Sequence, residues 1–107
     1  MGAFNTVKSE GKCPYCENEQ VWTIQFQPGD CWQYDYSIGD KLRWGGNKKG
    51  RNVGGDVRTD GVAEESCKVC GREFLDAAVY FKDNVIKRIE LLKEPLNLVD
   101  YFERINE

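Results

Sequence analysis

The sequence predicts a mainly β fold, a small α+β domain in which a bound metal ion clamps an antiparallel sheet. Three observations support this prediction: two distant Cys-x2-Cys pairs, several segments with apolar residues at every second position, and turn residues between those segments. A β-hairpin and a short C-terminal helix complete the predicted architecture. Because the chain has 107 residues, we expect residues 1–107 to form a single domain.

The cysteine pairs are Cys13-Pro14-Tyr15-Cys16 and Cys67-Lys68-Val69-Cys70. Each pair places two thiols on one tight turn, and together they offer the four soft ligands of a tetrahedral structural Zn²⁺. We therefore predict that Cys13, Cys16, Cys67 and Cys70 bind Zn²⁺ as a structural cofactor. Iron held by the same thiolates is one alternative, and a redox site and unrelated core cysteines are the others.

The separation of the two pairs is unusual for such a site. Fifty residues lie between Cys16 and Cys67, whereas the compact pattern has roughly 15–20. Because the entropy of loop closure grows only logarithmically, the extra length costs about 1 kcal/mol. Structural Zn²⁺ contributes on the order of 10–16 kcal/mol in small peptides. The free energy of metal binding therefore exceeds the cost of loop closure, provided that the intervening residues form strands that return the chain to its start.

Residues 20–44 are predicted to form a meander of short strands with one aromatic face. Gln20 to Gln27 alternates between apolar and polar residues, Cys31 to Tyr36 alternates again, and residues 42–44 continue a third strand. Residues 28–30 and 39–40 supply the turns. The aromatic set comprises Trp22, Phe26, Trp32, Tyr34, Tyr36 and Trp44. We expect it to be buried; if exposed, it could stack nucleic-acid bases.

Residues 45–55 are predicted to be a mobile loop, because five of these eleven residues are glycine and almost none are apolar. The wider segment 40–58 carries six basic and two acidic side chains, which leaves +4 in a chain of net charge −3. Candidate phosphate contacts in it are Lys41, Arg43, Lys48, Lys49 and Arg51. A basic face that is merely solvated is the alternative.

The segment from Phe74 to Leu92 is predicted to be a β-hairpin. Two runs rich in β-branched and aromatic residues, 74–81 and 85–92, flank the turn residues Lys82-Asp83-Asn84. A short extended piece, residues 57–62, is expected to lead into the second cysteine pair. The spacing of apolar residues such as Ile86 and Ile89 also approximates a helix, which remains the alternative.

The C-terminus is predicted to form a short helix over about residues 96–106. Pro95 breaks the preceding pattern and Asn97 is a candidate N-cap. The apolar stripe of this helix would be Leu98, Val99, Phe102 and Ile105. We expect the stripe to pack on the sheet; an exposed stripe that binds a partner helix is the alternative.

The order of these motifs resembles a zinc ribbon. Cys67-Lys68-Val69-Cys70-Gly71-Arg72 is similar to the knuckle of that family. The fuller order is Met1-Gly2 with Phe4, Cys13-Pro14-Tyr15-Cys16, Gly29-Asp30-Cys31, Gly39-Asp40, Trp44-Gly45-Gly46 and the second knuckle. It resembles small uncharacterised bacterial and phage zinc-ribbon proteins over residues 1–92. The resemblance implies a structural ion and a role in binding nucleic acid or protein, without a single activity.

No catalytic constellation accompanies the cysteines. The chain has no His, and four thiolates would close the coordination sphere. We therefore expect a non-catalytic binding module that contacts a protein partner, with nucleic-acid binding through residues 40–58 as the alternative. The fifth cysteine, Cys31, is expected to be a semi-buried side chain; a reactive thiol is the alternative.

The sequence shows neither a membrane-spanning run nor a secretory signal, and this guides the expected cellular location. No run approaches the roughly 18 apolar residues that span a bilayer, so we expect no membrane partner. The N-terminal segment Met1 to Val7 lacks the basic and apolar regions of a secretory signal. We therefore expect a cytoplasmic protein, whose thiols stay reduced.

Overall fold

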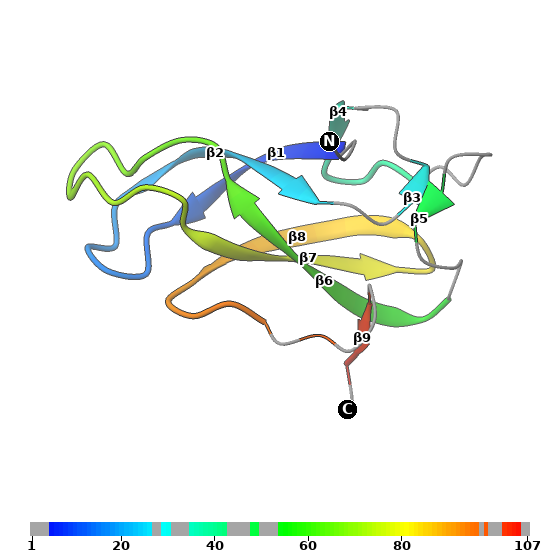
Figure 1. Cartoon of the computed structure of the whole chain (residues 1–107). Coiled ribbons are helices and arrows are strands. Elements are labelled where there is room, and N and C mark those ends of the chain that lie inside the picture. The colour runs from blue at the N-terminus through cyan, green and yellow to red at the C-terminus, as the bar shows by residue number, and fades with distance from the viewer. Residues whose placement is uncertain are drawn as a thin grey trace.

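In the computed structural model, β-strands surround one hydrophobic core (Figure 1). The structure describes residues 5–26, 29–30, 35–42, 48–49, 54–96, 98 and 102–105. The strands in these ranges are β1 (Asn5–Lys12), β2 (Glu19–Phe26), β3 (Gly29–Asp30), β4 (Asp35–Ser37), β5 (Lys48–Lys49), β6 (Asp56–Ala63), β7 (Asp76–Lys82), β8 (Val85–Leu92) and β9 (Glu103–Arg104). No helix occurs in the described ranges.

One seven-stranded sheet dominates, in the order β4-β1-β2-β6-β7-β8 with β9 paired to β6. Neighbours are antiparallel except β4, which runs parallel to β1. The residues after β4 join the start of β8: the N–H of Gly39 donates to the carbonyl of Ile86 (2.8 Å) and the N–H of Leu42 to that of Asn84 (2.7 Å). Residues 35–37 form one end of this order as β4, and residues 39–42 bond to β8 at its other end, so the sheet wraps around its core.

The predicted meander is wrong in its pairing. The strand predicted at Gln20–Gln27 is confirmed as β2, but its neighbours are β1 and β6. The next described strand of the main sheet, β4, lies on the far side of β1. β1 was not expected, because Val7 is its only large apolar residue.

The core contains the described members of the aromatic set that was predicted to be buried. Trp22, Phe26 and Tyr36 are at most 5% exposed. The indole N–H of Trp22 donates to the carbonyl of Gly11 at 2.9 Å, so this polar atom keeps a partner inside the core. Base stacking by these side chains is therefore excluded. Trp32, Tyr34 and Trp44 lie outside the described residues.

The predicted hairpin is confirmed as β7 and β8. Asp83 and Asn84 form its two-residue loop with φ angles of 50° and 69°, the left-handed pair that a type I′ turn requires. Tyr80 pairs with Arg88 while Phe81 pairs with Ile86, so β8 carries a β-bulge. The bulge lets Ile86 and Ile89 both point inward, and this explains the helix-like spacing.

The predicted C-terminal helix over residues 96–106 is wrong. Glu103 and Arg104 form β9, which pairs with Val57 and Arg58 of β6. The edge of β6 is open there because β2 pairs only with its other end, at residues 62–63. Phe102 packs edge-on against Phe81, with ring centroids 5.7 Å apart. Sheet pairing and this core contact outweigh the propensity of a helix that is too short to be stable alone.

The basic segment is described only in part. Lys48 and Lys49 lie within the predicted mobile loop and form β5, which pairs with β3. The side chain of Lys41 is exposed, and its backbone forms a bridge to Val85. Arg43 and Arg51 fall outside the described residues.

Gly61 provides a direct test of how β6 crosses β2. A Cβ atom at this position would lie 2.5 Å from the carbonyl oxygen of Gln25 and 2.7 Å from the Ile24 side chain. We expect Gly61→Ala to lower the free energy of unfolding by about 1–3 kcal/mol, because backbone has to move. In the control Gly54→Ala, the nearest atom is a side-chain oxygen of Asp83 at 3.4 Å. Denaturant unfolding that finds both variants equally stable would contradict this packing.

Candidate metal centre

Each cysteine pair lies in the turn between two antiparallel strands. We call residues 13–18, between β1 and β2, the first knuckle, and residues 67–72, between β6 and β7, the second knuckle. Ile24 of β2 pairs with Ala63 of β6, so the strand leaving one knuckle lies beside the strand entering the other. Both turns therefore lie at the same end of the molecule, as Figure 1 shows. Strand pairing thus brings the two cysteine pairs together although 50 residues separate Cys16 from Cys67 in the sequence.

The four sulfur atoms form one cluster. The Sγ atoms of Cys13, Cys16, Cys67 and Cys70 all lie within 4.8 Å of one another. The Sγ atoms of Cys13 and Cys70 are 3.8 Å apart, and those of Cys16 and Cys67 are 3.4 Å apart. A tetrahedral ion with Zn–S bonds of about 2.3 Å would separate its sulfurs by about 3.8 Å. The predicted ligand set is thus brought together and can hold a metal ion.

The knuckles share one hydrogen-bonding pattern. In the first, the N–H of Glu17 donates to the carbonyl of Cys13; in the second, the N–H of Gly71 donates to that of Cys67, both at 2.9 Å. The residue after each second cysteine is left-handed, with φ of 65° at Glu17 and 78° at Gly71. Glycine adopts this conformation freely, whereas Glu17 is strained. Gly71 therefore suits its position, and Glu17 takes the same geometry without the favoured residue.

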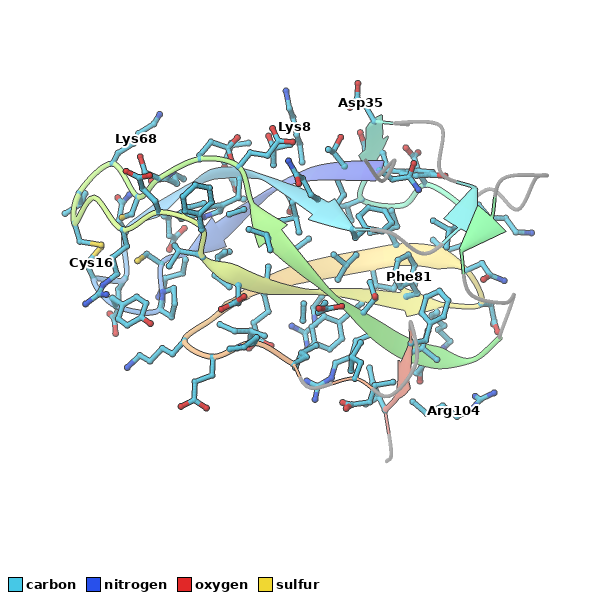
Figure 2. All side chains as sticks on the ribbon, viewed as in Figure 1. Lys8, Cys16, Asp35, Lys68, Phe81 and Arg104 are labelled. Atoms are coloured by element: carbon cyan, nitrogen blue, oxygen red, sulfur yellow. The ribbon has the colours of Figure 1, made fainter. Side chains whose placement is uncertain are left out.

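Burial is graded across the cluster. Cys13 and Cys67 are buried, Cys16 is half-buried and Cys70 is exposed. Figure 2 shows Cys16 at the end of the molecule, with the Lys68 side chain extending outward from the second knuckle. The ion would lie between the two turns with one ligand at the surface.

Backbone N–H groups lower the pKa of one of the four cysteines, Cys67. Hydrogen bonds from the N–H of Cys70, and secondarily of Val69, lower the pKa of Cys67 from 9.0 to about 6, against the opposing effect of burial. At Cys16, the N–H of Asn18 lowers the pKa, but desolvation and the hydrogen bonds that the Cys16 thiol makes to the other cysteine sulfurs outweigh this effect and raise the pKa to about 11. The backbone hydrogen bonds of the second knuckle therefore favour the thiolate form of Cys67.

A polar network outside the sulfurs ties the knuckles together. The Gln20 side chain accepts hydrogen bonds from the Asn18 side chain (2.9 Å) and the Lys68 N–H (3.0 Å), and it donates to the carbonyl of Ser66 (3.1 Å). The Asn18 amide lies 3.9 Å from the Sγ of Cys67. Sequence reasoning missed Gln20 and Asn18, because only their closeness to Cys16 in the chain hinted at this role.

A cleft adjoins the centre. It has a volume of about 300 Å³ and is lined by Tyr15 of the first knuckle, Arg72 of the second and Lys93 after β8. Phe74, also in its lining, is 76% exposed. Sequence reasoning missed this cleft, because its walls come from three segments that only the fold brings together.

Comparisons of the chain with protein-family models, curated proteins and solved structures find no match. In the described part of the chain, no helix has the length and apolar character needed to cross a membrane.

Replacement of single ligands tests the cluster. We expect Cys13→Ser, Cys16→Ser, Cys67→Ser and Cys70→Ser each to reduce bound metal well below one ion per chain, because each removes one of four soft ligands. Loss of the ion should also lower the free energy of unfolding by several kcal/mol. The measurement is elemental analysis after dialysis, with Cys31→Ser as the matched control. Full metal content in any one of the four ligand variants would contradict the site.

The pH dependence of metal affinity tests the pKa of Cys67. Because this pKa lies near 6, below the ordinary 9.0, the thiolate stabilises the metal-free fold at high pH, and that stabilisation is lost as the pH falls through about 6. Protons then compete with the ion at this sulfur as well. We expect the logarithm of the apparent Zn²⁺ affinity to fall by about one additional unit per pH unit below about pH 6. Chelator-competition titrations that give one constant slope through pH 6 would argue against it.

Proposed function

We propose that the chain is a non-catalytic, zinc-stabilised binding module that contacts a protein partner. The single observation that carries the proposal is the surface beside the metal centre. There, Phe74 is 76% exposed and Val69 is 68% exposed. Large apolar side chains that stay exposed on a folded surface are typical of protein-binding sites.

The closed ligand set supports a structural ion. Four thiolates fill a tetrahedral coordination sphere and leave no position for a substrate, as in structural zinc sites. We choose Zn²⁺ because it is the usual ion for such a set, and elemental analysis distinguishes it from iron. Four thiols without disulfide bonds also fit the cytoplasm, where thiols stay reduced.

A protein partner is favoured over nucleic acid. The described aromatic side chains proposed for base stacking, Trp22, Phe26 and Tyr36, are buried in the core. Among the described residues, the two most exposed large apolar side chains are Val69 and Phe74, which lie in or next to the second knuckle and outside the basic segment 40–58. No comparable observation favours phosphate contacts by Lys41, Arg43, Lys48, Lys49 and Arg51, which stay an alternative for the test.

Chemical crosslinking of the tagged full chain in native extracts tests the proposal. With zinc bound, we expect one recurrent protein partner that unlabelled chain competes away, and we expect the adduct to disappear after chelation, because the metal orders both knuckles. The Cys13→Ser chain is the matched control. Absence of a competed partner would remove the protein-binding role. Single-stranded DNA binding that weakens steeply with salt and is lost when Lys48, Lys49 and Arg51 become Glu would establish the alternative instead.

A further inference from the structure

We propose that the cleft beside the metal centre binds a protein segment that places one carboxylate on Arg72 and an apolar side chain on Phe74. The inference rests on the proposed protein-binding function, and it adds the surface and the chemistry of the partner. Three independent features of the described residues support it: an exposed residue in a strained conformation, a stacked arginine without an ion pair, and the charges lining the cleft.

Phe74 is the first feature. Its φ of 56° is left-handed, a conformation in which the Cβ atom of a non-glycine residue crowds the following carbonyl oxygen. The strain does not bury the ring, which is 76% exposed. The next residue, Leu75, is anchored: its side chain is 5% exposed and its carbonyl accepts the N–H of Ala63 at 2.9 Å. Phe74 is thus presented to solvent from a fixed backbone, as an anchor for a partner would be.

Arg72 is the second feature. Its Cζ atom lies 3.8 Å from the ring centroid of Tyr15, and the Tyr15 hydroxyl donates to the carbonyl of Lys93 at 3.1 Å. The ammonium of Lys93 lies 5.7 Å from the same ring centroid. Within the described part of the chain, neither cation forms an ion pair. A stacked guanidinium keeps the N–H groups along its edge available, in the geometry that grips a carboxylate through two hydrogen bonds.

The charges of the lining select the partner. Besides Arg72 and Lys93, the cleft of about 300 Å³ is lined by Glu73 and Asp76. One carboxylate can pair with Arg72 in this setting, whereas a run of phosphates would meet the two acidic side chains. A peptide that combines one acidic residue with an apolar neighbour therefore fits better than a nucleic-acid backbone.

The metal pre-organises the cleft. Tyr15 belongs to the first knuckle and Arg72 to the second, so the stacked pair spans the two turns that the sulfur cluster joins. A surface held in its bound arrangement loses little entropy on binding. Recognition by the cleft should therefore require the ion, although the ion contacts no part of the partner.

The test is selection from a random peptide display library on the zinc-loaded full chain at physiological salt. We expect enriched peptides to share Asp or Glu beside Leu, Ile, Phe or Trp. For a synthetic enriched peptide, Arg72→Gln and Phe74→Asn should each weaken binding at least about tenfold, with a smaller loss for Arg72→Lys, which keeps the charge but not the two-point geometry. Asn tolerates the left-handed backbone, so Phe74→Asn removes the ring without adding strain.

Val21→Thr and Lys87→Gln are the controls, because Val21 is exposed on β2 and Lys87 on β8, and neither lines the cleft. Both should bind the peptide as the parent does. Metal content shows that each variant keeps its centre. Failure to enrich any peptide, enriched peptides without an acidic residue, or undiminished binding by Arg72→Gln and Phe74→Asn would each overturn the proposal. So would oligonucleotide binding that depends on Arg72. Peptides that bind elsewhere would overturn this site while leaving the protein-binding function in place.

Discussion

The structure depends on the meeting of four thiolates contributed by two turns that are distant in sequence. Cys13 and Cys16 close the β1–β2 hairpin, and Cys67 and Cys70 close the β6–β7 hairpin. Between β2 and β6, strand pairing is limited to two residue pairs, so these hairpins share a short seam. An ion held by these four sulfurs, at the end of that seam, would restrain both turns at once. The free energy of coordination, on the order of 10 kcal/mol in small peptides, far exceeds the cost of closing the intervening loop.

A closed centre of this kind supplies rigidity. Its second benefit is the surface around it, since Tyr15, Arg72 and Phe74 all lie in or beside the knuckles. The strained φ angles of Glu17 and Phe74 both occur at this end of the molecule. Strain persists where the surrounding structure over-determines the backbone, and here the clamped turns and the anchored Leu75 do so. We infer that the metal acts on binding only through the arrangement of these side chains.

Local patterns predicted the parts of the fold that local chemistry decides. The two Cys-x2-Cys pairs predicted the ligand cluster, and the alternation of Trp22, Ile24 and Phe26 predicted a strand with one buried face. The turn residues Lys82-Asp83-Asn84 predicted the hairpin. The features that were predicted wrongly or missed depend on contacts between distant parts of the chain. β1 carries little apolar signal and exists because β2 and β4 pair with it. The C-terminal residues favoured a helix locally but instead fill an open edge of β6, and the cleft required three separate segments to meet.

X-ray absorption spectroscopy at the metal edge of the protein as purified tests the central claim most directly. It identifies the bound element and reports the number and type of its ligands. We predict zinc surrounded by four sulfur atoms at about 2.3 Å, with no nitrogen or oxygen neighbour in the same shell. A shell with fewer sulfurs, or with oxygen or nitrogen ligands, would mean that the two knuckles do not share one ion, and the account of this fold and its surface would be wrong.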